Sequence, residues 1–367
     1  MTRLRYSLIG SGGSIAEDHL DAIAQLDADL ESLVDQDGER GTELARALGA
    51  LFFSDHRAML AETSPDVAVV ATPHPSHAEI AIDCMQSGAH VLVEKPMAVE
   101  VAEADAMIDA AVRTERILGV CFQFRFRPAI EEAHRLVSED ALGRLLRVSC
   151  RETMTRTDAY FRSAAWLGTW GGEGGGVLLN QGPHALDLLC HLAGPPVRVS
   201  GWTRTLMHSI EPEDTGLALV EFASGAVGEI LLSTVDSAPL RLELVGERGT
   251  AEVLDRRLKF TRWEPDLPTH VASSHEFHEP PKRRPQKMSV PRGDGDHLDV
   301  HRDFLEAVRE GREPRTSGRE GLASLELANA IALSDSRSGA AVDLPLDREA
   351  YSVLLAVRRA GSSYPAT

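Results

Sequence analysis

The alternation of short apolar runs with amphipathic segments over the first 122 residues constrains the fold of this chain most strongly. Strands are predicted at 4–9, 30–34, 50–53, 66–71, 90–94 and 117–122, and helices at 15–26, 39–48, 78–87 and 99–114. Strands that alternate with helices pair in parallel, because each helix returns the chain to the same edge of the sheet. We therefore predict a doubly wound α/β domain over residues 1–122. The alternative is an α/β domain that binds no nucleotide, since it would show the same pattern.

The pattern changes after residue 123. A helix is predicted at 128–139, followed by strands at about 144–155, 197–205, 215–222, 226–235, 240–246 and 249–254. Consecutive strands without crossover helices indicate an antiparallel sheet. Helices at about 298–310 and 319–336, an extended segment at 339–345 and a helix from Asp347 complete the chain, while 264–296 has no clear periodicity. We predict an α+β domain over residues 123–367 with an open, mostly antiparallel sheet.

Residues 89–97 indicate a reactive lysine. The apolar run Val91-Leu-Val93 leads directly into Glu94, Lys95 and Pro96. Proline cannot donate to a strand ladder, so Lys95 is expected at the carboxyl edge of the sheet, where open parallel sheets bind ligands. Lysine is scarce in the chain, with four residues among 38 Lys+Arg. A buried ammonium can lower its pKa and transfer protons, whereas arginine cannot. The alternative is a lysine that reaches from the strand end into solvent.

A glycine-rich turn connects the first strand to the first helix. Gly10, Gly12 and Gly13 would let the backbone approach a pyrophosphate, although Ile15 occupies the third glycine position of GxGxxG. Asp35 ends the second strand near the spacing expected for a carboxylate that binds the adenosine ribose. That carboxylate would repel a 2′-phosphate, so NAD is favoured and NADP remains possible. The alternative for Asp35 is a plain strand-to-helix turn.

A second polar group follows the glycine-rich turn at 173–176. We predict that Asn180, His184 and Asp187 lie at positions i, i+4 and i+7 of one helix and share a face. A neutral histidine beside a lysine could act as a general base. A histidine packed in a helix interface is the alternative.

Charge and cysteine content narrow the functional classes. The formal charge of −18 argues against nucleic acid or an anionic membrane as a partner. The basic run 282–287 is interpreted as a solvated loop. Four scattered cysteines show no metal-ligand spacing, so we predict reduced thiols and no metal site. No signal peptide and no apolar run of about 20 residues are evident, which predicts a cytoplasmic protein.

Several motifs together resemble the Gfo/Idh/MocA family of NAD(P)-dependent sugar and polyol oxidoreductases. They are Ile-Gly-Ser-Gly at 9–12, Ala71-Thr-Pro with His77, Glu94-Lys95-Pro96, Phe-Arg-Phe-Arg-Pro at 124–128, the Gly-Gly-Gly…Asn-Gln-Gly-Pro-His…Asp block ending at Asp187, and Phe-Leu-Glu-Ala-Val-Arg-Glu-Gly at 304–311. They occur in the family order over nearly the whole chain. The resemblance implies a Rossmann domain and a second α/β domain whose open sheet mediates homodimers or homotetramers.

The resemblance also implies residue roles. Lys95 would hydrogen-bond the reacting oxygen, and His184 would exchange its proton while hydride moves to or from the nicotinamide. Many members carry Asp where this chain has Asn180, so the amide would only orient His184, and Asp187 would either polarise the site or pack. The predicted cofactor contacts are Gly10, Gly12, Gly13, Ser14, Ile15, Asp35, Thr72, Pro73, His77, Glu94 and Lys95. The predicted substrate contacts are Gln123, Arg125, Tyr160, Arg162, Trp166, Asn180 and His184.

Three functions are compatible with these residues. The first is a dehydrogenase or reductase that acts on a secondary hydroxyl or ketone of a sugar, cyclic polyol or glycoside. The second is redox-neutral cleavage of a glycoside with tightly bound NAD. The third, a non-catalytic NAD-responsive regulator, is disfavoured because both Lys95 and His184 are present.

Overall fold

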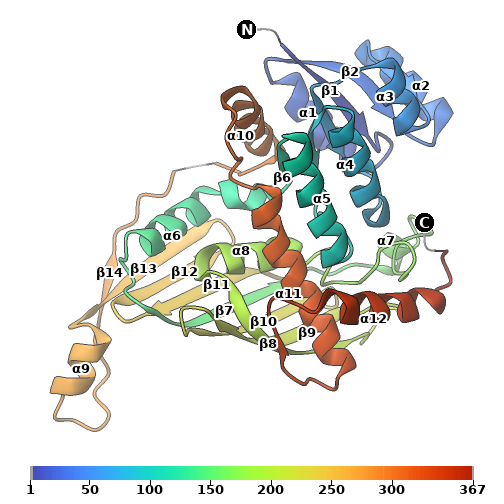
Figure 1. Ribbon diagram of the computed structural model, residues 1–367. Coiled ribbons are helices and arrows are strands. Elements are labelled where there is room, and N and C mark those ends of the chain that lie inside the picture. Colours follow the sequence, from blue (N-terminus) through green and yellow to red (C-terminus); the bar gives the residue numbers. More distant parts are fainter. Residues whose placement is uncertain (1–2, 292, 366–367) are drawn as a thin grey trace.

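The first sheet is a doubly wound parallel sheet. The computed structural model describes residues 3–291 and 293–365, so the predicted domain ends at 1–2 and 366–367 lie outside the described residues. Six strands pair in parallel in the order β3-β2-β1-β4-β5-β6 (Figure 1). Their bounds are β1 Leu4–Ile9, β2 Ala28–Val34, β3 Leu51–Phe53, β4 Val67–Val70, β5 His90–Val93 and β6 Leu118–Val120. The predicted α/β architecture is confirmed.

Helices cover both faces of this sheet and bury its central strands. All four residues of β4 and the last three of β5 are buried, as expected for strands covered on two sides. The helices are α1 Ala16–Ala24, α2 Gly38–Leu48, α3 His56–Glu62, α4 His77–Gln86 and α5 Val101–Thr114. The short helix α3 was not predicted. The Asp55 side chain caps it by accepting from two backbone N–H groups, and that local signal marks its start.

The second sheet has nine strands in the order β14-β13-β12-β11-β7-β10-β9-β8-β15. Its pairings are antiparallel except for β7 with β10, which confirms a mostly antiparallel sheet. The strands are β7 Leu145–Thr153, β8 Pro196–Arg204, β9 Thr215–Phe222, β10 Val227–Ser233, β11 Ala238–Gly246, β12 Gly249–Leu254, β13 Arg257–Glu264, β14 Lys282–Gln286 and β15 Val342–Asp343. Helices α6 Pro128–Ser138, α8 Pro183–Ala193 and α11 Gly318–Ser336 pack on one face (Figure 1).

The segment between β12 and α10 corrects part of the sequence interpretation. β13 and α9 (Leu267–Ser273) were not predicted, and the basic run at 282–287 is mostly the edge strand β14 rather than a loop. Proline and charged side chains tolerate such an edge position, because one side of the strand needs no ladder partner. Four of the five residues of β14 are exposed, so the run is solvated as expected.

Helix α10 (His297–Glu310) does not cover the second sheet. It packs against α1, and its buried Val300, Phe304 and Leu305 join the apolar core around Tyr6 and Leu8 of β1. The prediction that this helix packs in the second domain is therefore wrong, because it packs on α1 beside the first sheet (Figure 1). Helix α10 thus lies beside the first sheet, whereas α11 and α12 (Arg348–Ala360) pack beside α5. The chain division at residue 122 stays a prediction.

Candidate active site

Lys95 lies where the two parts of the chain meet. It directly follows β5, and its Nζ donates a hydrogen bond of 2.9 Å to the backbone oxygen of Asn180. The side chain is partly buried. Burial lowers the pKa of Lys95, although the carboxylate of Glu94 opposes that shift. An ammonium has three donors, so two remain for a ligand after the bond to Asn180.

His184 is the second residue of α8 and is 8% exposed. Its ring stacks on Phe124 with centroids 4.2 Å apart, and Phe122 lies edge-on at 5.9 Å. The buried Nδ1 has no hydrogen-bond partner among the described residues. Burial, followed by the charge of Lys95, holds the pKa of His184 well below its ordinary value. The imidazole is therefore neutral and able to accept a proton.

The predicted placement of Asn180 on this helix is wrong. Helix α8 begins at Pro183, because the preceding glycine-rich segment continues as turns through Gly182. The Asn180 amide donates to Glu173 and, over 2.9 Å, to the hydroxyl of Tyr160. Its backbone oxygen binds Lys95. Asn180 thus organises the turn before His184 instead of sharing a helical face with it.

Asp187 forms a buried ion pair with Arg125. The guanidinium Nη2 and Nε lie 2.6 and 2.8 Å from the two carboxylate oxygens, and both side chains are at most 2% exposed. Arg125 also donates to Glu320 over 2.9 Å. These partners engage the Arg125 guanidinium, which argues against its predicted contact with substrate. Two roles were left open for Asp187, polarising the site or packing. The structure favours packing, as part of the ion pair with Arg125.

The other predicted substrate contacts differ in their surroundings. Tyr160 accepts from Gln181 over 3.2 Å as well as from Asn180, and Gln123 has a buried Oε1 without a partner among the described residues. Trp166 lies edge-on to His74 at 5.9 Å. Arg162 is 73% exposed and lies 3.7 Å from Asp158, so it is the most solvent-facing member of the set.

The glycine turn fits a dinucleotide. Gly10 has φ +94°, and a Cβ there would lie 2.5 Å from the backbone oxygen of Ala71, so only glycine fits. The Gly12 N–H donates to Asp35 over 2.7 Å, which fixes the turn against the end of β2. The buried hydroxyl of Ser11 has no partner among the described residues, as a group awaiting a ligand would. Gly13, Ser14 and Ile15 complete this turn before α1.

The predicted cofactor contacts that follow β4 and β5 lie at the same carboxyl edge of the first sheet as the glycine turn. His77 is fully buried, with Nδ1 2.9 Å from the Pro96 oxygen and Nε2 2.7 Å from the Thr72 oxygen. It therefore joins the loop containing Pro73 to the loop containing Lys95. Glu94 is 5% exposed and faces α1 and α10 rather than the open edge.

Two buried glutamates were missed by sequence reasoning. Burial raises the pKa of Glu152 to about 7, and the charges of Arg127 and Lys95 oppose this. Burial likewise raises the pKa of Glu173 to about 7. Glu152 shares the inward face of β7 with Val148 and Cys150, so a carboxylate at an apolar position of an alternating strand was the available signal.

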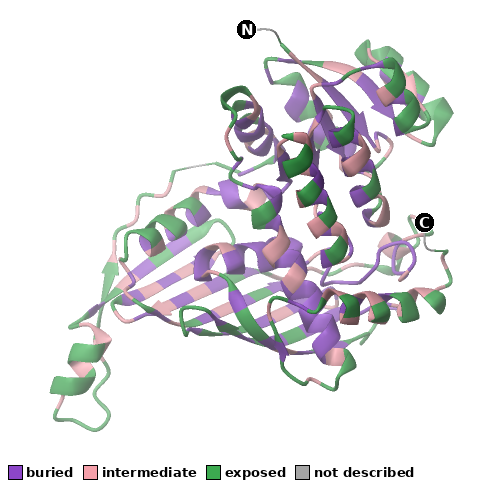
Figure 2. Ribbon diagram, viewed as in Figure 1, coloured by how far each residue is buried: buried purple, intermediate pink, exposed green. Residues whose placement is uncertain are grey.

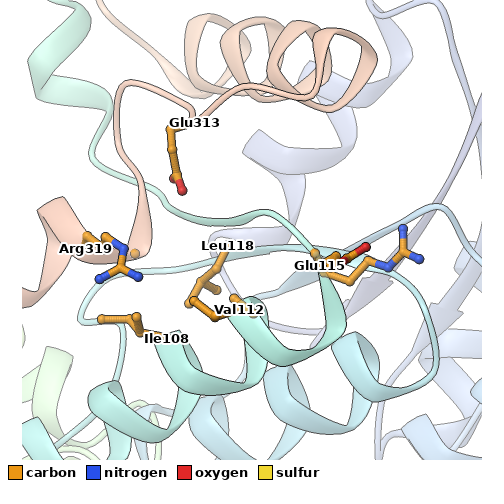
Figure 3. Close-up of a pocket in the computed structure, with 9 residues that line it drawn as sticks. Ile108, Val112, Glu115, Leu118, Glu313 and Arg319 are labelled. Carbon is orange, nitrogen blue, oxygen red and sulfur yellow. The ribbon is translucent and has the colours of Figure 1, made fainter.

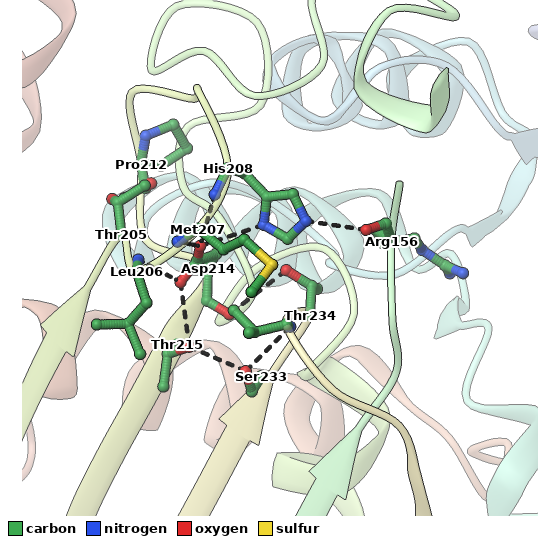
Figure 4. A network of polar contacts seen from close by, with 11 residues as sticks. Arg156, Thr205, Leu206, Met207, His208, Pro212, Asp214, Thr215, Ser233 and Thr234 are labelled. Atoms are coloured by element: carbon green, nitrogen blue, oxygen red, sulfur yellow. Dashed lines mark hydrogen bonds and ion pairs between the residues drawn. The ribbon is translucent and has the colours of Figure 1, made fainter. Parts of the chain in front are cut away.

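A polar network fixes the loop that carries Arg156 (Figure 4). The buried carboxylate of Asp214 accepts from the backbone N–H groups of Leu206, Met207 and His208. The His208 ring lies 3.1 Å from Asp214 and 2.9 Å from the backbone oxygen of Arg156. The Arg156 guanidinium in turn lies 4.8 Å above the Tyr160 ring. This network therefore positions a cation beside the predicted substrate contacts.

A separate pocket opens between α5 and the start of α11 (Figure 3). Its lining includes Ile108, Val112, Glu115, Leu118, Glu313 and Arg319. The described residues that line it include no predicted catalytic, cofactor or substrate contact. Its position gives it no part in the chemistry at Lys95.

Comparisons with known proteins match nearly the whole chain. A family model described as "Oxidoreductase family, NAD-binding Rossmann fold" matches residues 4–122, and one described as "GFO/IDH/MocA C-terminal domain" matches 130–252. The chain is 29% identical to D-apiose dehydrogenase of Paraburkholderia graminis, over 96% of this chain and 92% of that protein. It is 25% identical to myo-inositol 2-dehydrogenase of Thermotoga maritima, over 91% and 98% respectively.

A solved structure extends the likeness to the fold. The WlbA dehydrogenase from Bordetella pertussis, in complex with NADH and UDP-GlcNAcA, is 31% identical with a TM-score of 0.81. The match covers 94% of this chain and all of that one. Over the described residues, no helix is both long and apolar enough to span a membrane.

Proposed function

Because the chain belongs to the Gfo/Idh/MocA family of NAD-binding oxidoreductases, we propose that Lys95 and His184 are its catalytic pair. The protein is an NAD-dependent oxidoreductase that acts on a hydroxyl group of a sugar or polyol. Bound NAD supplies the acceptor or donor of hydride. Removal of hydride from a carbinol carbon also requires loss of the hydroxyl proton, so a base must lie beside the reacting oxygen.

Each member of the pair has a distinct task. Lys95 keeps two free donors and stabilises negative charge as it develops on the reacting oxygen. The neutral imidazole of His184 accepts the hydroxyl proton on a ring nitrogen, and its position on Phe124 fixes the ring plane. In the reverse direction the same groups return the proton to a carbonyl oxygen.

One contact carries this proposal. The 2.9 Å hydrogen bond from Lys95 Nζ to the Asn180 oxygen joins the carboxyl edge of the first sheet to the turn that precedes His184. Two motifs that are distant in the chain, those of Lys95 and Asn180, thus lie in contact. The Tyr160 hydroxyl lies 2.9 Å from the Asn180 amide, and we propose Tyr160, Gln123 and Trp166 as substrate contacts.

We propose that Asp35 favours NAD over NADP, because a carboxylate at the end of β2 would repel the 2′-phosphate. Its two oxygens already accept from the N–H groups of Gly12 and Asp37, at 2.7 and 2.9 Å. Those bonds hold the carboxylate against the glycine turn. Titration of the protein with each cofactor should give a lower dissociation constant for NAD.

The substrate is found by direct assay. The purified protein is incubated with NAD and a panel of inositols, free sugars, aryl glycosides and nucleotide sugars, and the near-ultraviolet band of NADH is followed. We expect one substrate class to give a sustained rise. No rise with any class, in a protein that binds NAD, would contradict net oxidation of these substrates.

The comparisons do not support redox-neutral glycoside cleavage, the alternative that the sequence left open. It requires cofactor that stays bound and returns to its starting state after each turnover. The dehydrogenase names of the relatives above favour net oxidation instead. Release of an aryl leaving group without accumulation of NADH would favour cleavage.

We propose a homo-oligomer formed through the open face of the second sheet. Exposed residues alternate with buried ones along its strands (Figure 2). Four of the exposed residues on neighbouring strands are apolar, namely Trp202, Leu217, Leu219 and Val227. Adjacent exposed apolar groups of this size favour protein contact over water. We also propose a cytoplasmic location, since all four cysteines are free and buried.

A further inference from the structure

Four metal-ligating side chains meet behind the strand ends that carry Lys95. They are His19 of α1, Glu94 after β5, Cys121 after β6 and His297 at the start of α10. One ligand atom from each lies within 4.8 Å of the others. The four residues are between 0% and 7% exposed. We propose that this zinc cluster, His19, Glu94, Cys121 and His297, binds one Zn²⁺ ion through all four side chains.

The spacing fits a tetrahedral ion. Glu94 Oε1 lies 3.2 Å from His19 Nε2 and 3.4 Å from His297 Nε2. An ion that holds nitrogen and oxygen ligands at about 2.0–2.2 Å in a tetrahedron separates them by about 3.3–3.5 Å. A good N–H···O bond is shorter, with a typical N···O distance of about 2.9 Å. His297 Nε2 accordingly has no hydrogen-bond partner among the described residues and points into the cluster.

The outer contacts are those of a metal site. His19 Nδ1 lies 2.9 Å from His301 Nε2, which fixes the His19 ring, and His19 Nε2 hydrogen-bonds Glu94 Oε1 inside the cluster, a contact that the ion would replace. His297 Nδ1 lies 3.9 Å from Asp18, and Glu94 Oε2 accepts from the Lys95 N–H over 3.0 Å. Ligating imidazoles and carboxylates generally have such second contacts, which orient them toward the metal.

The ligand set also balances charge. A thiolate and a carboxylate together neutralise one divalent cation, and two imidazoles complete four-coordination. The competing explanation is a buried hydrogen-bonded ion pair between Glu94 and a histidine. That explanation leaves Cys121 as a thiol beside the Glu94 carboxylate, whereas a zinc ion would bind it as a thiolate ligand.

A zinc ion at this position would join α1 and the ends of β5 and β6 to α10. It would hold α10 against α1 and, through Glu94, fix the backbone of Lys95. Four protein ligands would fill the tetrahedral coordination and leave no open position for substrate. The ion would therefore be structural. Cysteine and histidine spacing along the sequence could not predict it, since each ligand comes from a different element.

The test uses the full-length protein and metal ions alone. Metal content is measured after purification and after dialysis against a chelator, and one equivalent of Co²⁺ is then added to the stripped protein. We expect about one Zn²⁺ per chain as purified, and intense visible bands with a near-ultraviolet thiolate-to-cobalt charge-transfer band after Co²⁺ addition. Absence of the charge-transfer band in the wild-type protein would by itself overturn the proposal.

Two cysteine variants assign the band. Cys121→Ser should abolish it, whereas Cys84→Ser, which alters an equally buried thiol of α4, should retain it. Zn²⁺ should raise the thermal midpoint of the stripped wild-type and Cys84→Ser proteins and leave that of Cys121→Ser unchanged. Persistence of the band in Cys121→Ser would refute ligation by this thiolate.

Discussion

At the scale of single residues, the proposed mechanism depends on the ammonium of Lys95. Lys95→Met keeps most of the side-chain length and removes the charge that stabilises the reacting oxygen. We expect kcat to fall by about 10²–10³-fold, the range for loss of one electrostatic donor. The NAD dissociation constant should change much less, because the other proposed cofactor contacts, including those of the glycine turn, are unchanged.

The control for that variant is Lys259→Met, which alters a side chain of β13 that is 75% exposed. It should leave kcat and KM unchanged in steady-state assays with the substrate that the panel identifies. A Lys95→Met enzyme with wild-type kcat would remove Lys95 from the mechanism.

Glu152 gives a pH dependence of stability. Its folded-state pKa of about 7 lies above the ordinary value of 4.5, so the folded protein holds the proton more tightly than the unfolded chain. Stability conferred by that proton is present at pH 4.5 and below and is lost as pH rises through about 7. Glu152→Gln should therefore gain more stability relative to wild type at pH 8 than at pH 5, by up to about 3 kcal/mol.

Urea denaturation of the cofactor-free protein at both pH values measures this difference. The control is Glu221→Gln on β9, whose side chain is 56% exposed. It should show no comparable change between pH 5 and pH 8. Equal effects of Glu152→Gln at the two pH values would show that Glu152 titrates normally.

The sequence predicted single residues where their chemistry was unusual for their position. Lys95 stands at a strand end in a lysine-poor chain, and His184 follows a glycine-rich turn, so both could be proposed as catalytic residues from the sequence. Glu152 was visible in principle, because it interrupts the apolar face of β7. The contact of Asn180 with Glu173 was not predictable, since it depends on where α8 begins.

At the scale of elements, Arg125 connects the short 3₁₀ turn at Gln123–Phe126 to α8 and α11. It pairs with Asp187 of α8 and Glu320 of α11. Arg125→Leu would leave the buried Asp187 carboxylate without its partner. We expect the free energy of unfolding to fall by about 3–5 kcal/mol, as for other broken buried pairs.

Chemical denaturation measures that loss. Arg144→Leu removes a guanidinium that is 61% exposed and pairs with Glu247, and it should leave stability nearly unchanged. A similarly small effect of Arg125→Leu would mean that Asp187 is stabilised by groups other than Arg125.

Element prediction succeeded where hydrophobic periodicity was strong. β1, β9 and β12 were predicted within one residue of their observed bounds. β14 was missed because an edge strand of charged residues and proline has no buried face to impose alternation. The position of α10 was wrong because its apolar stripe shows that it packs on something, but not on which sheet.

At the scale of the whole molecule, the proposed assembly depends on the open face of the second sheet. Leu219 of β9 is 58% exposed at the centre of the apolar face. Leu219→Lys places a charge in the proposed interface, so the protein should shift to monomer in light scattering coupled to size exclusion. Leu206→Lys, at an exposed loop position, should keep the wild-type mass. Retention of the oligomer by Leu219→Lys would place the interface elsewhere.

The two-sheet architecture could be predicted from the sequence, because strands alternate with helices in the first half and follow one another in the second. How the halves meet did not follow, since the Lys95 to Asn180 contact and the zinc cluster join residues that are distant in the chain. Contacts of that kind depend on the packing of complete elements and leave no local pattern.

The most direct test of the central claim is transfer of deuterium. The active substrate is labelled at the carbinol carbon and incubated with NAD, and the nicotinamide product is analysed by mass spectrometry. We predict stoichiometric deuterated NADH in the wild type and at least about 100-fold slower transfer in Lys95→Met. Conversion of substrate without deuterated NADH would contradict net hydride transfer at this site.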